Sequence, residues 1–297
     1  MIKMIVSDMD GTLLNENMEI SPANVSAVKR AQSEGYHFAI ATGRDYPLAF
    51  PMLEENGIKC PLIAQNGAQY FDETGKNIYN RGLEKSTVRK MLSIFAGHSD
   101  IHEELMTNKG IFSDNKEKRF EMVASMIYDM SPDTSYEEAL ESAKRHLDKL
   151  QITFVDNYEE IIKDESAIIL KVSVHSKKGH EILDPLKDEL HQAVPDLSIT
   201  ASSKRNLEIN HQNAQKGIAV SQLAKQLGIK ADEVMVLGDN INDLSMMKWA
   251  KYSVAMANAE PEVKDVARFE TSSNRENGVA EAISRVLGGK YLYKLKT

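Results

Sequence analysis

The feature that most constrains this fold is a short apolar run that ends directly in a polar loop. Runs of this kind occupy residues 3–7, 38–41, 62–64 and 234–237. The first leads into Asp8-Met9-Asp10-Gly11, and the last leads into Gly238-Asp239-Asn240. Short apolar runs bounded by turn residues are typical of buried strands.

Helical segments lie between these runs. Ser21 and Pro22 form an N-cap followed by proline at the first helical position, and Gly35 ends the predicted helix. Residues 216–228 carry apolar side chains at helical spacing before the strand at 234–237. Strands that alternate with helices predict an α/β fold with a parallel sheet and crossover connections.

The middle of the chain has a different pattern and predicts a second domain. Residues 168–174 alternate apolar and polar side chains, which is typical of an antiparallel sheet with one solvent-facing side. Long polar helices surround such strands. The sequence therefore predicts a core domain of residues 1–82 and 213–297, with an α+β domain of residues 83–212 inserted into it.

Charge and apolar patterning narrow the class of partner. The 297-residue chain has a formal net charge of −8, which argues against nucleic acid and anionic membrane as partners. The sequence contains no apolar stretch of about 18 residues and no signal-peptide pattern. The single cysteine, Cys60, points to a buried thiol rather than a nucleophile. We expect a cytoplasmic protein whose partner is a small molecule; the sequence does not specify an oligomeric state.

Four polar clusters are expected to meet at one edge of the core sheet, because ligands bind at the carboxyl ends of parallel strands. The clusters are Asp8–Thr12, Thr42–Arg44, Lys216-Gly217 and Gly238–Asp243. Asp8 and Asp10 are two residues apart, so an extended chain places both on one side, facing Asp239. An all-oxygen set of this kind suits Mg²⁺.

These residue types fit transfer of a phosphoryl group. Asp8 would attack phosphorus, while Lys216 and the Thr42 hydroxyl would hold the phosphate oxygens. Asp10 would protonate the leaving oxygen and then activate a water molecule. For the first step Asp10 needs a raised pKa and a side chain that the metal does not bind, so its metal contact would be its backbone carbonyl.

The four clusters, in this order, resemble those of the haloacid dehalogenase-like hydrolases, and the segment Gly238–Met247 resembles the Cof-like branch. The resemblance extends from Ile5 to Asn277-Gly278-Val279. It implies a Rossmann-like core, an inserted cap domain that closes over the site and sets specificity, and a magnesium-dependent phosphatase. The substrates that it favours are small phosphorylated metabolites, sugar phosphates above all, hydrolysed through a phosphoaspartyl intermediate on Asp8.

The resemblance also implies a role for each motif residue. Asp8 is the nucleophile, Asp10 is the acid/base, and both bind magnesium together with Asp239. Asp243 lies behind them and holds Lys216 or a metal-bound water. The groups that contact phosphate are the Met9 backbone, Thr42, Gly43, Lys216 and Asn242. The residues before the lysine, Asn213-Ala214-Gln215, differ from the small hydrophobic ones found in many members.

Several alternatives remain open on the sequence alone. A phosphomutase would use the same phosphoaspartate but return the phosphoryl group to another hydroxyl. A catalytically silent phosphate-binding regulatory protein is a third reading, although the presence of both Asp8 and Asp10 speaks against it. Arg44, Asn66 and Arg275 are either substrate contacts or residues that serve backbone and turn hydrogen bonding. The sequence names neither the individual substrate nor the specificity residues of the cap.

Overall fold

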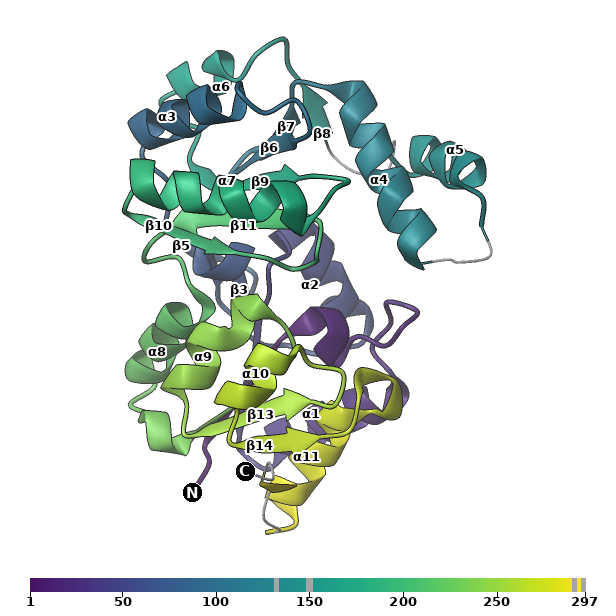
Figure 1. Cartoon of the computed structure of the whole chain (residues 1–297). Coiled ribbons are helices and arrows are strands. Elements are labelled where there is room, and N and C mark those ends of the chain that lie inside the picture. The colour runs from purple at the N-terminus through teal and green to yellow at the C-terminus, as the bar shows by residue number, and fades with distance from the viewer. Residues whose placement is uncertain (131–133, 148–151, 290–292, 295–297) are drawn as a thin grey trace. The chain divides into compact units, whose positions relative to one another are not determined.

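The chain forms two compact units, which we call the core unit and the inserted unit. The computed structural model describes residues 1–130, 134–147, 152–289 and 293–294. The core unit comprises Met1–Asn80 and Asn213–Thr297, and the inserted unit comprises Arg81–Gln212 (Figure 1). In the described part of the chain, no helix combines the length and the apolar character needed to cross a membrane.

A mostly parallel sheet forms the centre of the core unit. Its strand order is β15-β14-β13-β12-β1-β2-β3-β4-β5, and the pairs from β14 to β3 are parallel, whereas β4, β5 and β15 pair antiparallel at the edges. This confirms the predicted α/β fold with a parallel core sheet. The strands are β1 (Met4–Ser7), β2 (His37–Ala41), β3 (Leu62–Ala64), β4 (Gln69–Phe71), β5 (Asn77–Asn80), β12 (Val234–Gly238), β13 (Tyr252–Met256), β14 (Phe269–Thr271) and β15 (Tyr293–Lys294).

Strand β1 lies between β2 and β12, and every residue of β1 is buried. Ser7 pairs with Ile40 on one side and with Leu237 on the other. The three strands therefore end at the same level, and the loops that follow β1, β2 and β12 leave the sheet together. This register is what brings distant polar clusters to one edge.

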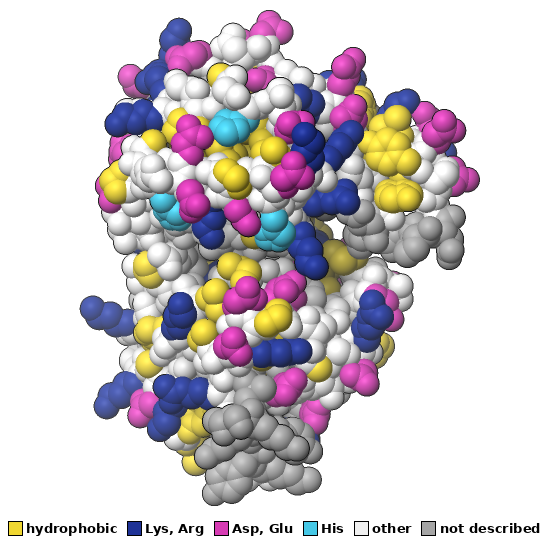
Figure 2. All heavy atoms as spheres, in the orientation of Figure 1, with side chains coloured by type: hydrophobic (Ala, Val, Ile, Leu, Met, Phe, Trp, Pro, Cys, Tyr) yellow, Lys and Arg dark blue, Asp and Glu magenta, His cyan; other side chains and the backbone are white. Residues whose placement is uncertain are grey.

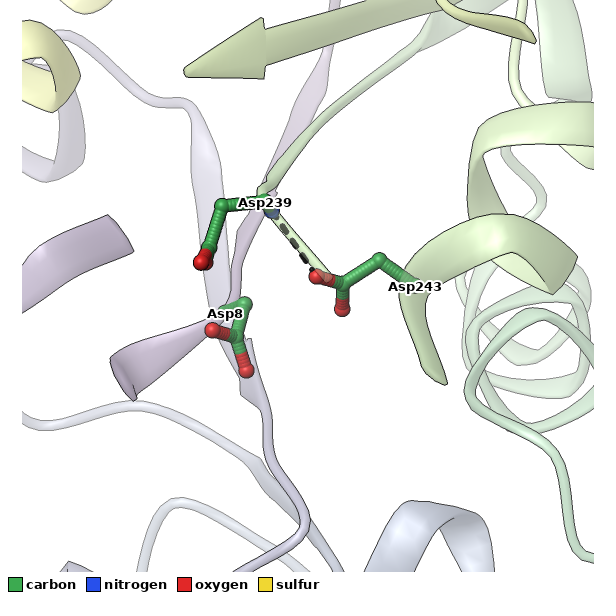
Figure 3. Close-up of side chains that lie close together, drawn as sticks. All are labelled: Asp8, Asp239 and Asp243. Carbon is green, nitrogen blue, oxygen red and sulfur yellow. Dashed lines mark hydrogen bonds between the residues drawn. The ribbon is translucent and has the colours of Figure 1, made fainter. Parts of the chain in front are cut away.

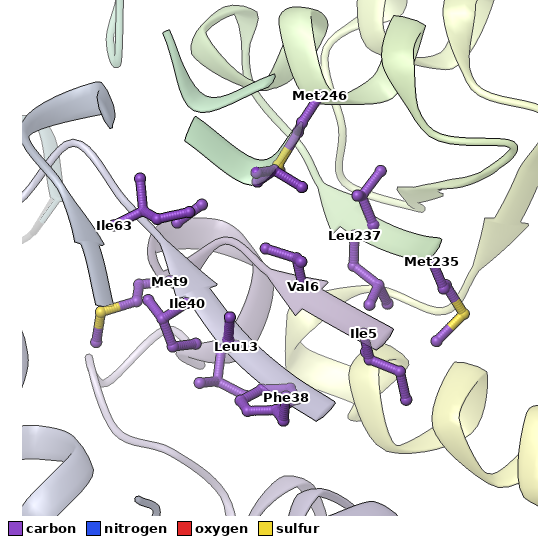
Figure 4. Packing of buried hydrophobic residues seen from close by; sticks show 14 of the residues in the cluster. Ile5, Val6, Met9, Leu13, Phe38, Ile40, Ile63, Met235, Leu237 and Met246 are labelled. Atoms are coloured by element: carbon purple, nitrogen blue, oxygen red, sulfur yellow. The ribbon is translucent and has the colours of Figure 1, made fainter. Parts of the chain in front are cut away.

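Helices flank the strands and bury the apolar faces of the sheet. The first begins as predicted, with the Ser21 hydroxyl accepting the N–H of Asn24 at 3.2 Å and Pro22 in the first turn. Figure 4 shows how side chains from β1, β2, β3 and β12 pack together. The helices of this unit are α1 (Pro22–Ser33), α2 (Tyr46–Glu55), α8 (Lys216–Gln226), α9 (Leu244–Trp249), α10 (Pro261–Val266) and α11 (Gly278–Leu287).

The inserted unit has its own sheet and its own apolar core. The strand order is β10-β11-β9-β6-β7-β8. Its strands are β6 (His102–Thr107), β7 (Gly110–Ser113), β8 (Ile152–Phe154), β9 (Ile169–His175), β10 (Leu197–Thr200) and β11 (Asn206–His211). Its helices are α3 (Lys85–Phe95), α4 (Lys116–Met130), α5 (Tyr136–Leu147), α6 (Glu159–Lys163) and α7 (His180–Ala193). Residues such as Met91, Leu105 and Leu186 form a cluster separate from the core-unit cluster.

The sheet of the inserted unit differs from the expected one in two respects. It is antiparallel except for β7 and β8, which pair parallel. The polar side chains of Lys171 and Ser173 in β9 are also buried instead of facing solvent. Burial is possible because the charges are paired: Lys171 Nζ lies 2.9 Å from Glu208 Oε1, and both side chains are under a tenth exposed.

Acidic and basic side chains are interspersed on the face of the molecule that Figure 2 shows. A broad field of one sign is not visible there.

Candidate active site

Asp8 is the first residue after β1, and its side chain is only about 5% exposed. Its backbone N–H donates to the Leu237 carbonyl of β12 at 3.0 Å. That bond continues the pairing of β1 with β12 by one residue, so the carboxyl group is held directly at the end of the sheet. The chain then turns at Met9–Leu13 and keeps the following residues close to the same edge.

Lys216 joins two aspartates from distant parts of the chain. It begins α8, its side chain is fully buried, and its Nζ lies 2.7 Å from both Asp8 Oδ1 and Asp243 Oδ1. The second oxygen of Asp243 accepts the N–H groups of Asp239 (2.9 Å) and Asn240 (3.0 Å). Asp243 therefore fixes both the lysine and the loop after β12.

Asp239 is positioned by the loop that follows Asp8. The Thr12 hydroxyl donates to Asp239 Oδ1 at 2.6 Å. Gly11 has φ of +74°, and a Cβ at this position would overlap the Asp239 carboxylate. The loop can therefore approach the carboxylate only with glycine at position 11.

Asp8, Asp239 and Asp243 form an acidic cluster, with one oxygen from each residue within 4.8 Å of the others (Figure 3). Burial is the main reason that the pKa of Asp8 is well above its usual value; Lys216 opposes the rise, and the neighbouring aspartates add to it. Burial and then Asp243 raise the pKa of Asp239 to about 7. Burial alone would lower the pKa of Lys216, but Asp243 and Asp8 outweigh it and raise that pKa.

The formal charges of the cluster do not balance. Three ionised carboxylates and one lysine carry a net charge of about −2, which a single divalent cation would neutralise. The donor set consists of oxygens alone, which suits a hard divalent cation. Asp243 already accepts bonds from three donors, so Asp8 and Asp239 are the carboxylates that fit a metal best.

The Thr42 cluster lies at the end of β2. The Thr42 hydroxyl accepts the N–H of Arg44 at 3.1 Å, a bond that does not use its own proton. Arg44 forms two bonds to Asp10, with Nε 2.8 Å from Oδ2 and Nη2 2.6 Å from Oδ1. Burial alone would lower the pKa of Arg44, but the bond to Asp10 and its charge raise it. The Asp10 side chain is thus engaged by Arg44, a partner that the sequence analysis did not foresee.

Two further predicted residues, Met9 and Asn242, lie in the segments that follow β1 and β12. Asn242 donates from Nδ2 to Asn66 Oδ1 at 3.2 Å, and both side chains are buried. Met9 lies in the turn after Asp8, and its carbonyl accepts the N–H of Leu14. Arg275 is exposed, in the turn before α11. Gly217 packs against Ser245, whose hydroxyl accepts its N–H at 2.9 Å.

Two residues of the site had no assigned role in the sequence analysis. Thr12 had a local signal, because it stands in the same polar loop as Asp8 and Asp10. Asn258 had none: its Nδ2 donates to the Gly11 carbonyl at 2.8 Å from 247 residues away in the chain. Only the folded structure connects these positions.

Known proteins match the chain along almost its full length. The profile of the haloacid dehalogenase-like hydrolases matches residues 5–283. Phosphatase YwpJ of Bacillus subtilis is 28% identical, with 96% of this chain and 100% of the relative covered. The 5-amino-6-(5-phospho-D-ribitylamino)uracil phosphatase YwtE of the same organism is 31% identical, with 98% and 100% covered. A solved haloacid dehalogenase-like hydrolase from B. subtilis has a TM-score of 0.84 at 27% identity, with 96% of this chain and 100% of that chain covered.

The family match and the whole-length relatives named phosphatases confirm the enzyme class predicted from the four clusters. The motif residues come from both ends of the chain and meet at the end of one sheet, as that prediction requires. The chain therefore belongs to the haloacid dehalogenase-like hydrolases, as a phosphatase of the Cof-like branch.

Proposed function

We propose that this chain is a magnesium-dependent phosphatase that hydrolyses small phosphorylated metabolites through a phosphoaspartyl intermediate on Asp8. One observation carries the proposal: Lys216, fully buried, bonds Asp8 and Asp243 at once, while Asp239 stands beside them. Burying three carboxylates around one lysine is costly for folding alone, because each charge must be removed from water. A catalytic site accounts for that cost.

The metal would be held by Asp8 and Asp239, together with the backbone carbonyl of Asp10. When bound, Mg²⁺ would neutralise phosphate charge and so favour attack by an anionic nucleophile. The excess negative charge of the cluster supports a divalent cation. Asp243 would stay with Lys216 and the loop after β12, where its bonds already place it.

Asp8 would attack phosphorus, forming the P–O bond to its carboxylate as the bond to the leaving oxygen breaks. Lys216 holds the Asp8 carboxylate in place, and its charge favours the ionised form that attack requires. The Met9 backbone, Thr42, Gly43, Lys216 and Asn242 would hold the phosphate oxygens. The hydroxyl proton of Thr42, which the bond from Arg44 does not use, supports its part in this set.

Asp10 would give a proton to the leaving oxygen and then take one from the water that attacks the phosphoaspartate. Arg44 binds both oxygens of Asp10, so the carboxyl group must leave Arg44 before it can donate a proton. About 46% of the Asp10 side chain is exposed, which leaves it room to move. The acid/base role therefore includes a step in which the ion pair with Arg44 opens.

The substrate class that we favour is a phosphate ester of a polyhydroxylated carbon chain. The family resemblance favours sugar phosphates, and the relative YwtE is named for a substrate that carries a phosphoribityl group. Both share a phosphate on a hydroxyl-bearing chain. Recognition of the rest of the substrate is assigned to no residue.

The test is release of inorganic phosphate from a panel of phosphorylated sugars and sugar alcohols. Wild-type protein with Mg²⁺ should release phosphate, and EDTA should stop release until Mg²⁺ is restored. Asp8→Asn should lose turnover more than about a thousandfold while the fold is kept, since the nucleophile is removed. Isomerised sugar phosphate without free phosphate would instead indicate a mutase. Binding without turnover would indicate a regulatory protein.

A further inference from the structure

The loop Gln65–Gly67 after β3 has a backbone that ordinary side chains disfavour. All three residues have positive φ, at +50° for Gln65, +59° for Asn66 and +98° for Gly67. Only glycine adopts this region freely, and asparagine tolerates it better than most residues. Strained backbone of this kind persists where surrounding bonds hold it, and it is frequent at functional sites.

The surrounding bonds connect this loop to the Thr42 cluster. The Asn66 N–H donates to the Thr42 carbonyl, and the Gln65 N–H donates to the Arg44 carbonyl, each at 2.9 Å. Gly67 approaches the other side of the site, where an added Cβ would lie 2.7 Å from the carbonyl of Gln215, the residue before Lys216. The loop therefore lies against two of the four motif clusters through its backbone.

Asn66 also reaches the cluster after β12 through its side chain. Its Oδ1 accepts one N–H of Asn242 Nδ2 at 3.2 Å, and both residues are less than a tenth exposed. This bond fixes the orientation of the Asn242 amide group. It uses one of the two N–H groups on Nδ2, so the other can point to a ligand. Through one backbone bond and one side-chain bond, Asn66 connects Thr42 with Asn242, 200 positions apart in the sequence.

We propose that Asn66 is a positioning residue, which holds Thr42 and Asn242 as a preformed pair of phosphate donors. The inference rests on the proposed function, because Thr42 and Asn242 are phosphate contacts only within it. Asn66 itself need not touch the substrate. It removes rotational freedom from the Asn242 amide before phosphate arrives, and preorganised donors bind without that cost.

The first test is Asn66→Gly. Glycine accepts the positive φ without strain and keeps the N–H that Thr42 receives, but it removes the acceptor for Asn242. We expect KM for a phosphomonoester and the inhibition constant of inorganic phosphate to rise together, by about two- to tenfold, the range for one hydrogen bond. We expect kcat to change less than about twofold, since the donor serves bound phosphate throughout the reaction. Unchanged KM and inhibition constant would overturn the inference.

Asn277→Gly is the matched control. Asn277 also has positive φ, at +61°, and its Oδ1 accepts the Ser21 hydroxyl at 2.6 Å, at the start of α1. Both variants exchange a left-handed asparagine with a bonded side chain for glycine within the core unit. Only Asn66→Gly should change KM and phosphate inhibition. An equal change of KM and phosphate inhibition in Asn277→Gly would mean that the effect is a general loss of structure, which would contradict the inference.

A double-mutant cycle with Asn242→Ala separates positioning from direct contact. If Asn66 acts through Asn242, the variant Asn66→Gly/Asn242→Ala should have the KM of Asn242→Ala alone. Fully additive effects would overturn the inference. The variant Asp8→Asn distinguishes failure of the two proposals. If Asp8→Asn keeps turnover, the proposed function is refuted. If Asp8→Asn loses turnover but Asn66→Gly has a normal KM, only the role of Asn66 is refuted.

Discussion

At the scale of single residues, Gly11 sets how closely the loop after β1 approaches Asp239. Gly11→Ala adds a Cβ that overlaps the Asp239 carboxylate and forces alanine into positive φ. We expect the variant to lose about 1–3 kcal/mol of stability. We also expect a weaker apparent affinity for Mg²⁺, because Asp239 must move away. Thermal unfolding and the Mg²⁺ dependence of phosphate release measure the two effects.

Gly35→Ala provides the control for that substitution. Gly35 has φ of +87°, yet an added Cβ meets no atom within 4 Å. It should therefore show the backbone cost without a change in Mg²⁺ dependence. If both variants altered Mg²⁺ dependence equally, the close approach of Gly11 to Asp239 would not be the cause.

Asp239 also predicts how stability varies with pH in protein treated with EDTA. Burial and Asp243 raise its pKa from 3.8 to about 7, so the folded state holds the proton more tightly than the unfolded state. The stability that the Asp239 carboxyl group contributes is therefore present at low pH. It is lost as pH rises from about 4 to about 7, by up to about 1.4 kcal/mol of unfolding free energy per pH unit. The free energy of unfolding, measured in urea at a series of pH values, should fall more steeply with rising pH in wild type than in Asp239→Asn across this window. The same pH dependence in both proteins would contradict the prediction.

At the scale of helices and strands, one buried ion pair connects α4 with β6. Arg119 Nη1 lies 2.6 Å from Glu104 Oε2, and the two side chains are 9% and 0% exposed. Arg119→Met would remove the cation from the buried Glu104, whose other neighbour, His102, lies 3.5 Å away, so we expect a loss of about 3–5 kcal/mol in the free energy of unfolding. Chemical denaturation measures the loss. A change below about 1 kcal/mol would show that the pair does not hold the helix.

The pair between Lys144 and Glu141 on α5 is the matched control. Its partners are 47% and 64% exposed at 2.8 Å, so water already solvates both charges. Lys144→Met should cost less than about 1 kcal/mol. The contrast between the two variants isolates the effect of burial, because both replace a cation with methionine in a neighbouring helix of the same unit.

The sequence predicted those elements whose local pattern agrees with their surroundings. The apolar runs that became β1 and β12 are buried in any parallel sheet, and the polar loops after them mark its ligand-binding edge. The same reasoning failed for β9, where Lys171 alternates with apolar residues yet is buried, because its partner Glu208 is 37 positions away. Pairs such as Arg44 with Asp10 are likewise decided by tertiary contact, which local spacing does not encode.

At the scale of the whole molecule, the two units have separate apolar cores, and the acidic cluster belongs entirely to one of them. We expect a fragment of residues 81–212 to fold alone with a cooperative urea transition, because it is continuous and carries its own core. If the acidic cluster binds Mg²⁺ as proposed, Mg²⁺ should raise the stability of the full chain, because it would bind the folded state. It should leave the fragment unchanged. A fragment stabilised by Mg²⁺ would place a cation site outside the acidic cluster.

The position of β1 between β2 and β12 has a consequence for the newly synthesised chain. Asp8 leaves the ribosome well before the residues that complete its surroundings: Lys216, which bonds it, follows 208 positions later, and Asp239 lies further along the chain. The inserted unit emerges complete in between, and domains generally fold as they appear. A nascent chain arrested before residue 213 should therefore contain a folded insertion, with Asp8 still lacking Lys216 and Asp239. Activity would begin only after β12 has been made and has paired with β1.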